Sequence, residues 1–251
     1  MENWIAKTAR IGNDTKIGLN TIVENDVNIG NNCLIGHNVV IHKGSKIGDG
    51  VRIDDNSIIG KEPLYSPRSI FKAKKYEPAV IGNECLIGAN VVIYVGCEIG
   101  NKNLIADLST IRENVKIEDL NIVGRNVTIE NFVKIGNRCK FETNVYITAY
   151  SEVGDYCFIA PCVATSNDNY MARDKERYKH FKGITIKTGG RIGTNATILP
   201  GKVIEEDGMV AAGSVVTKDV PKEKIVLGSP AKLFKKVDER QLLKNNLDKD
   251  V

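Results

Sequence analysis

Residues 29–53 read IGNNCLIGHNVVIHKGSKIGDGVRI, with an isoleucine at every sixth position. This spacing of aliphatic residues runs without a miss from Ile5 to Ile59, and further series start at Ile81 and Ile186. The three series contain ten, fourteen and six hexads, which makes thirty in all. A six-residue period sustained over most of a chain indicates a repeat architecture.

The chemistry inside each hexad predicts a β-strand followed by a corner. A small or β-branched residue, such as Cys33 or Val39, lies four positions after the aliphatic one. Glycine often follows the aliphatic residue directly, as at Gly30, and Asn or Asp comes next. Gly and Asn supply the positive φ that a tight corner needs, and the helical spacing of three and four is absent. We therefore predict an all-β parallel β-helix with three hexads per coil of eighteen residues and about ten coils.

This pattern resembles the hexapeptide-repeat acyltransferases, which fold as left-handed β-helices. The resemblance covers nearly the whole chain, and it implies the left-handed coil. It leaves the substrate open, because one fold supports many chemistries.

Two segments interrupt the repeat. Residues 61–79 contain three prolines and several basic residues, and residues 166–183 read SNDNYMARDKERYKHFKG. Both are long enough to be functional loops. Counting coils between them predicts that they leave the solenoid from the same corner, five coils apart, as two flaps over one face. We expect one β-helix domain over residues 1–233 and a tail over 234–251 with a short C-terminal helix.

Composition narrows the function classes. The net charge is +4, and no basic block is long enough to suggest nucleic acid as a partner. Five of the six cysteines occupy the small inward position, so we expect no metal site there, and Cys162 is the exception. The sequence shows no signal peptide and no run of eighteen apolar residues, which favours a cytoplasmic protein without membrane contact.

Residues eighteen apart should stack vertically, which places candidate site residues in rows. Glu142, Thr143 and Asn144 lead three rows that continue, toward the C-terminus, mainly through small residues. These include Thr194 and Ala212 in the row of Thr143, and Gly213 in the row of Asn144. Small residues let backbone N–H and C=O groups reach a ligand. We therefore predict a groove for an extended ligand along these coils.

Four segments sharpen the resemblance: CKFETNVYI (139–147), YCFIAPCVATSNDNYMAR (156–173), KGITIKTGGRIGTNATILPG (182–201) and VAAGSVVTKDVPKEKIVLGSPAK (210–232). They are similar to nucleotide-sugar N-acetyltransferases, which acetylate an amino deoxysugar from acetyl-CoA during surface glycan biosynthesis, for lipopolysaccharide or S-layer glycans. The resemblance implies a homotrimer with active sites between neighbouring solenoids, acetyl-CoA as cosubstrate and no metal. It also implies CoA contacts along the C-terminal coils: Gly190, Arg191, Thr194, Ala212, Gly213, Ser214, Lys218 and Lys232.

Acetyl transfer requires a neutral amine held against the thioester carbonyl. We predict that Glu142 accepts a hydrogen bond from the amine and that Asn144, or Asn83 from an adjoining edge, positions the sugar. The remaining substrate candidates lie in the two loops, and they are Asn167, Asp168, Tyr170, Arg173, Lys61 and Pro63.

Other functions fit the repeat as well. An O-acetyltransferase would need a histidine base, for which His180 is the candidate, and an enzyme dependent on acyl-carrier protein would not use CoA. A zinc hydrolyase like the γ-class carbonic anhydrases needs three histidines around the metal, and His37, His42 and His180 do not have that spacing. A purely structural solenoid would not need two long polar loops. The choice of dTDP or UDP, the sugar, the ring position of the amine and the length of the acyl group stay open.

Overall fold

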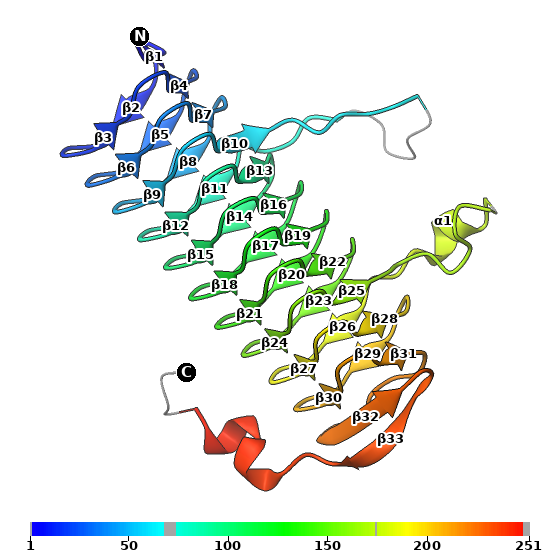
Figure 1. Cartoon of the computed structure of the whole chain (residues 1–251). Helices are drawn as coiled ribbons and strands as arrows, with labels where there is room; N and C mark the ends of the chain where they lie inside the picture. The colour runs from blue at the N-terminus through cyan, green and yellow to red at the C-terminus, as the bar shows by residue number, and fades with distance from the viewer. Residues whose placement is uncertain (1, 68–73, 174, 248–251) are drawn as a thin grey trace.

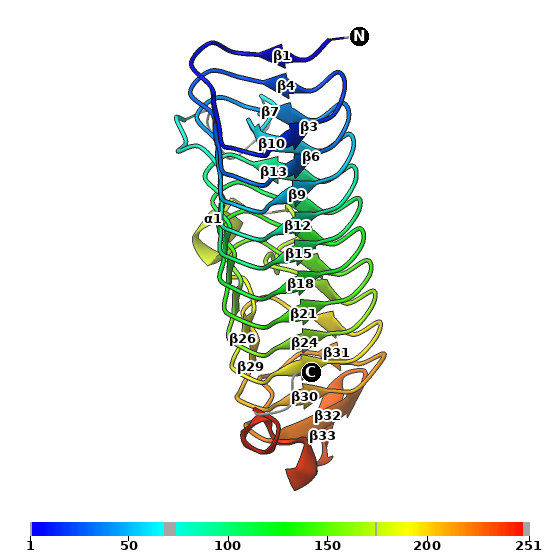
Figure 2. The ribbon, with the colours of Figure 1, turned by 90° about the vertical axis from the view of Figure 1, so that its left-hand side faces the viewer.

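The computed structural model describes residues 2–67, 74–173 and 175–247. Short parallel strands stack into three sheets that form the sides of a left-handed β-helix (Figures 1 and 2). Strands three apart in the chain are hydrogen-bonded neighbours, with partners such as Ile35 and Ile53 in register. The predicted fold of about ten coils with two protruding loops is confirmed.

Each sheet takes every third strand. Sheet A contains β1 (Trp4–Ile5), β4 (Ile22–Val23), β7 (Val40–Ile41), β10 (Ile58–Lys61), β13 (Val92–Tyr94), β16 (Thr110–Ile111), β19 (Thr128–Ile129), β22 (Tyr146–Ile147), β25 (Ala164–Thr165), β28 (Thr197–Ile198) and β31 (Val215–Val216). Sheet B contains β2 (Arg10–Ile11), β5 (Asn28–Ile29), β8 (Lys46–Ile47), β11 (Val80–Ile81), β14 (Glu98–Ile99), β17 (Lys116–Ile117), β20 (Lys134–Ile135), β23 (Glu152–Val153), β26 (Thr185–Ile186) and β29 (Val203–Ile204). Sheet C contains β3 (Lys16–Ile17), β6 (Leu34–Ile35), β9 (Arg52–Ile53), β12 (Leu86–Ile87), β15 (Leu104–Ile105), β18 (Ile122–Val123), β21 (Lys140–Phe141), β24 (Phe158–Ile159), β27 (Arg191–Ile192), β30 (Met209–Val210), β32 (Lys224–Gly228) and β33 (Ala231–Lys236).

The hexad produces this geometry through burial and corner conformation. From Val23 onward the second strand residue points inward and is buried, and the small residue four positions later joins it in one continuous core. The third residue after the buried aliphatic has positive φ in almost every hexad, for example Asn38 at 55°. Asn and Asp tolerate that conformation better than other residues with a Cβ. Both features of the hexad therefore act as predicted.

Three kinds of corner connect the sheets, and they hold the candidate sites. The A–B corner joins a sheet A strand to the next sheet B strand, as residues 112–115 do. The B–C corner is represented by residues 82–85, and the C–A corner by residues 142–145.

Two flaps project from the solenoid in the same direction (Figure 1). Flap 1 (residues 62–79) follows β10, and flap 2 (residues 166–184) follows β25 and contains α1 (Arg177–His180). Both strands belong to sheet A, where the order β10-β13-β16-β19-β22-β25 separates them by five coils. The prediction that both loops leave from one corner, five coils apart, is confirmed.

The C-terminal segment differs from the continuous helix expected from Phe234 onward. Residues 231–236 form β33, which pairs antiparallel with β32, and only two 3-10 turns follow, η1 (Glu239–Gln241) and η2 (Leu243–Asn245). Leu242 packs with Ile225 and Val237, and the Asp207 carboxylate accepts a hydrogen bond from the Leu243 N–H at 3.1 Å. The segment is therefore held by the pairing of β33 with the edge of sheet C and by this small apolar contact, in place of the hydrogen bonds of a helix. Over the described residues, no helix is both long and apolar enough to cross a bilayer.

Candidate functional site

The C–A corner brings together the predicted rows of small residues. The N–H groups of Cys162, Asn195 and Gly213 donate to the carbonyl oxygens of Thr143, Pro161 and Thr194, at 3.0, 3.1 and 2.8 Å. Positions one coil apart therefore stack as the eighteen-residue count predicted.

Glu142 is the first residue of this corner, and its carboxylate faces a cation. Its carboxylate lies 3.1 Å from Lys140 Nζ, and its side chain is 29% exposed. Asn144 occupies the left-handed corner position with φ of 63°, and its side-chain oxygen accepts a hydrogen bond from Asn126 at 2.8 Å. Asn144 therefore has a structural role that accounts for its residue type.

Asn83 does not join Glu142 within the chain. It lies at the B–C corner, and its Oδ1 accepts a hydrogen bond from the Asp49 N–H at 2.8 Å. The same contact repeats along this corner, where the side chain of Asn101 accepts from the Asn83 N–H at 2.9 Å. Within one chain Asn83 belongs to a ladder that ties successive coils together, and its role beside the sugar from an adjoining edge stays a prediction.

The residues expected to contact CoA do not all come together either. Thr194, Ala212 and Gly213 are exposed neighbours on the C–A corner. Gly190 and Ser214 are buried, and the Ser214 hydroxyl accepts a hydrogen bond from the Gly228 N–H at 3.1 Å. Both are thus less accessible than Thr194, Ala212 and Gly213, and their contact with CoA stays a prediction.

The three expected cationic contacts lie on three different elements. Lys218 follows β31 at the A–B corner, and Lys232 lies in β33. Arg191 lies in β27, and its Nε and one Nη are buried with no hydrogen-bond partner among the described residues. The strand of Arg191 directly precedes the C–A corner in the chain, and Lys232 pairs with Leu227 beside Gly228, whose N–H donates to Ser214 of that corner.

Flap 2 is organised by Asp168. Its carboxylate accepts hydrogen bonds from the N–H groups of Tyr170 and Ala172 at 2.8 and 3.1 Å, and it pairs with Arg177 at 2.9 Å. Desolvation opposes ionisation, but these donors and the cation outweigh it and lower the pKa of Asp168. Asp168 therefore holds the flap in shape.

The other flap 2 candidates surround this centre. The Asn167 carbonyl accepts from the Lys182 N–H at 3.2 Å, and the Arg173 N–H donates to the Tyr170 carbonyl at 3.0 Å. The Tyr170 ring stacks on His180 with centroids 5.7 Å apart. The four predicted residues Asn167, Asp168, Tyr170 and Arg173 therefore lie together in one flap.

The three histidines lie apart. His37 Nδ1 accepts from the Leu19 N–H at 2.8 Å, His42 Nδ1 lies 3.1 Å from Glu24, and His180 belongs to flap 2. No group of three His, Cys, Asp or Glu residues in the described part of the chain could hold a metal ion.

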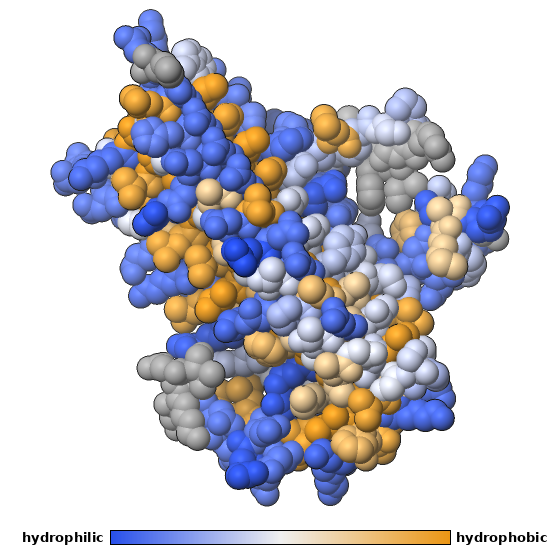
Figure 3. Space-filling view, in the orientation of Figure 1, coloured by the Kyte–Doolittle hydropathy of each residue, from blue (hydrophilic) through white to orange (hydrophobic). Residues whose placement is uncertain are grey.

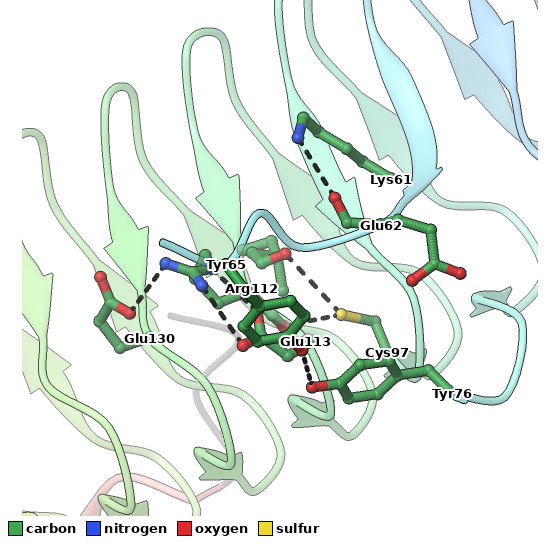
Figure 4. A network of polar contacts seen from close by, with 9 residues as sticks. Lys61, Glu62, Tyr65, Tyr76, Cys97, Arg112, Glu113 and Glu130 are labelled. Atoms are coloured by element: carbon green, nitrogen blue, oxygen red, sulfur yellow. Dashed lines mark hydrogen bonds and ion pairs between the residues drawn. The ribbon is translucent and has the colours of Figure 1, made fainter. Parts of the chain in front are cut away.

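A polar network that sequence reasoning missed occupies the A–B corner between the flaps (Figure 4). Arg112 donates from Nε and Nη2 to the two carboxylate oxygens of Glu113, at 2.9 and 3.3 Å, and its Nη1 lies 3.5 Å from Glu130. The guanidinium also lies over the Tyr94 ring, 5.0 Å from its centroid. Burial raises the pKa of Glu130 and of Tyr146.

Flap 1 packs beside this network. Lys61 Nζ also lies over the Tyr94 ring, 5.0 Å from its centroid, and the hydroxyls of Tyr65 and Tyr76 meet across the flap. Lys74 reaches Phe132, with Nζ 5.2 Å from the ring centroid. The predicted residues Lys61 and Pro63 are therefore near the network, and Pro63 is buried.

The sequence carried one signal for this network. The residue directly after the buried aliphatic is often glycine, but four consecutive coils replace it with Tyr94, Arg112, Glu130 and Thr148. Large polar groups at one corner, in the coils between two interruptions, mark that corner as special. The signal needs the coil register, because these residues are eighteen apart in the chain.

Comparison with known proteins identifies the repeat. A family model described as bacterial transferase hexapeptide (six repeats) matches residues 8–43. A second, described as the hexapeptide repeat of succinyl-transferase, matches residues 26–61, 78–106 and 114–149.

Relatives share parts of the chain. A 2,3,4,5-tetrahydropyridine-2,6-dicarboxylate N-acetyltransferase of Clostridium perfringens is 55% identical over 49 residues, which are 20% of this chain and 21% of that protein. The galactoside O-acetyltransferase of Escherichia coli is 31% identical over 93 residues, covering 35% of this chain and 45% of that protein. The chain thus spans less than half the length of either relative.

A solved structure covers more of the fold. The UDP-N-acetylglucosamine acyltransferase of Arabidopsis superposes over 99% of this chain and 77% of its own, with a TM-score of 0.53 and 15% identity. At this identity the likeness concerns the fold. The two family models thus match the hexapeptide repeats in parts of the chain, and these repeats are arranged as a left-handed β-helix.

Proposed function

We propose that this protein is an acetyl-CoA-dependent N-acetyltransferase that acts on the amino group of a nucleotide-linked amino deoxysugar. The observation that carries the proposal is the pair of flaps, which leave one corner five coils apart, together with the carboxylate and aromatic side chains that the corner between them bears. A nucleotide sugar is an extended ligand with an amine, hydroxyls and a planar base, and polar and aromatic groups along one corner suit it.

The donor would lie along the C–A corner. Thr194, Ala212 and Gly213 are exposed there, and a Cβ built on Gly213 would have no atom within 4 Å. An open, small-residue surface lets the amides of pantetheine approach the backbone. Arg191, with two buried guanidinium nitrogens that lack partners in the described chain, is the cation that a CoA phosphate would satisfy.

The reaction needs few protein groups. The amine nitrogen attacks the thioester carbonyl, a C–N bond forms, the C–S bond breaks and CoA leaves as the thiol. The proton lost from nitrogen must reach a base or solvent, and orientation of the amine accounts for most of the acceleration. Glu142 remains the carboxylate that sequence reasoning assigns to the amine.

We include a homotrimer in the proposal. Figure 3 shows apolar side chains gathered over the N-terminal coils, and exposed large apolar residues there include Ile22, Leu34 and Leu86. Apolar side chains at the surface of a solenoid are suited to contact with further copies. A neighbouring chain would also place its own B–C corner, with Asn83, against this one.

A thiol-release assay tests the function. The protein is incubated with acetyl-CoA and a panel of dTDP- and UDP-linked 3-amino and 4-amino sugars, and wild type is compared with Glu142→Ala and His180→Ala. Turnover on an amino sugar that survives His180→Ala supports direct attack by the amine. No turnover on any amino sugar contradicts the proposal.

A second candidate is transfer to a sugar hydroxyl. His180 lies in flap 2 against Tyr170, where it could serve as the base that a hydroxyl needs, and one relative carries the name galactoside O-acetyltransferase. Loss of activity with His180→Ala, on a hydroxyl acceptor, would favour this candidate. A third, transfer from acyl-carrier protein, would appear as turnover with that thioester and none with acetyl-CoA.

A further inference from the structure

We infer that Glu130, at the A–B corner between the flaps, is the carboxylate that binds the amino group of the acceptor. The inference rests on the proposed function and names the group that receives the amine. It replaces Glu142 in that role.

The position of Glu130 favours this assignment. It follows β19 directly, and one coil earlier Glu113 lies beneath flap 1 within reach of Tyr76. Two coils later the same corner opens into flap 2 at Ser166. Glu130 is therefore the carboxylate of this corner that lies between the covered network and flap 2.

Its binding capacity is not used up. Arg112 commits Nε and Nη2 to Glu113, so Glu130 receives only the third nitrogen, at 3.5 Å. The Tyr146 hydroxyl and the Asn131 backbone N–H also hydrogen-bond to the Glu130 carboxylate. A carboxylate accepts about four hydrogen bonds, so after these three contacts Glu130 can still accept one from an amine. Its side chain is 21% exposed, whereas that of Glu113 is 3% exposed.

The next residue in the chain, Asn131, has a side-chain donor without a hydrogen-bond partner in the part of the chain that the structure describes. Asn131 is only 4% exposed, and its Nδ2 has no hydrogen-bond acceptor among the described residues. A buried amide donor without a partner is destabilising, so such groups are rare in native structures. Because Nδ2 is buried, the Asn131 side chain would have to turn outward before a hydroxyl or ring oxygen of a sugar bound at Glu130 supplied the acceptor.

The electrostatics suit an amine. Glu130 faces Arg112, Glu113 and Tyr146, and the cations of flap 1 lie further out, Lys61 over the Tyr94 ring and Lys74 over the Phe132 ring. Desolvation by burial is the main reason that the pKa of Glu130 is raised. A carboxylate with a raised pKa is better matched to taking a proton near neutral pH. Glu142, in contrast, already lies 3.1 Å from Lys140.

Glu130 lies at the A–B corner and the proposed donor surface at the C–A corner, on opposite sides of sheet A, so the acetyl-CoA that meets this amine would lie on a neighbouring chain of the proposed homotrimer. In the reaction, Glu130 would accept a hydrogen bond from the amine, and the proton released as the C–N bond forms would pass to its carboxylate. The C–S bond would break with its electron pair on sulfur, and the CoA thiolate that leaves would take up a proton from solvent. Glu130 then returns to its ionised state as the amide product departs.

The experiment compares steady-state kinetics of wild type, Glu130→Gln, Glu130→Asp and Glu142→Gln on the amino sugar that wild type turns over best. Glu98→Gln is the matched control, because Glu98 is an exposed sheet B residue paired with Lys116. Each variant is also melted to show that it is folded, and kcat/KM is followed from pH 5 to pH 9.

We expect Glu130→Gln to lose about 10²–10⁴-fold in kcat/KM, the usual contribution of a proton-accepting group. Glu130→Asp should recover part of this loss, and the acidic limb of the wild-type pH profile should disappear in Glu130→Gln. Should Glu130→Gln misfold, Tyr146→Phe provides the second test, with a shifted acidic limb expected.

Other results overturn the inference. If Glu130→Gln keeps wild-type kcat/KM and pH profile while Glu142→Gln loses activity, Glu142 binds the amine and the proposed function stands. If wild type acetylates no amino sugar, the proposed function itself fails, and the inference fails with it.

Discussion

Arg112 and Glu113 form a two-point ion pair at the A–B corner, with N···O distances of 2.9 and 3.3 Å. The two residues are adjacent in the chain, and the Glu113 side chain is 3% exposed while that of Arg112 is 29% exposed. This pair satisfies a carboxylate that would otherwise be buried alone beneath flap 1. It also decides which carboxylate of the corner remains free for a ligand.

Replacing Glu113 by Ala should lower the free energy of unfolding by about 2–3 kcal/mol, because it leaves a half-buried guanidinium without its main partner. Urea unfolding followed by circular dichroism measures the change. Glu98→Ala, which breaks an exposed pair with Lys116, should cost less than about 1 kcal/mol. Equal losses in the two variants would show that the network contributes no more than a surface pair.

Asn83→Ala should act on stability and leave the chemistry intact. Its Oδ1 accepts from the Asp49 N–H at 2.8 Å, and loss of one such bond costs about 1 kcal/mol. The melting temperature should fall while kcat for the best amino sugar stays within about twofold of wild type. A large loss of kcat with an unchanged melting temperature would instead restore Asn83 to the active site, through a neighbouring chain.

Flap 2 should loosen at low pH. The pKa of Asp168 is lowered by its N–H donors and Arg177, so its stabilising contribution is present above the usual value of 3.8 and is lost as the pH falls through the lowered pKa. Hydrogen exchange of flap 2 should therefore increase below about pH 3.8. Asp168→Asn should show faster exchange at neutral pH as well, while Asp238→Asn, in the C-terminal segment, should not. Unchanged exchange in Asp168→Asn would mean that other contacts hold the flap.

Phe141 is the position where the core departs most from its repeat. It is fully buried in a row otherwise built from Ile and Val. Phe141→Ala should cost about 3–5 kcal/mol through lost burial and the cavity that remains. Phe141→Ile, which restores the residue type of the repeat, should cost less than about 1.5 kcal/mol if neighbouring coils close around it. Similar urea midpoints for the two variants would contradict this packing argument.

Most of the fold could be predicted because each hexad encodes its own geometry. The aliphatic residue sets the inward direction, and the corner residue with positive φ ends the strand, as Asn38 does. Stacking then follows from counting, so the rows at Thr194 and Gly213 and the shared corner of the flaps could be derived from the spacing of residues alone. The C-terminal segment could not, because Phe234 has no repeat to fix its pattern and pairs with an edge of sheet C instead.

The site was harder to predict because it depends on side-chain direction and on residues distant in sequence. Gly190 and Ser214 fit a resemblance by position, yet both are buried. Glu130 was missed because a single charged residue after a buried isoleucine looks like solvated surface. Its meaning appears only when Tyr94 and Arg112 are placed in the coils before it and the flaps on either side.

The most direct measurement is of the bond formed. Wild-type protein is incubated with acetyl-CoA labelled with ¹³C at the acetyl carbonyl, together with the amino-sugar panel, and the product is analysed by NMR. We predict a labelled amide carbonyl bonded to the sugar nitrogen, with one CoA thiol released per amide formed. A labelled ester, or label that stays on CoA with every amino sugar, would contradict N-acetyl transfer.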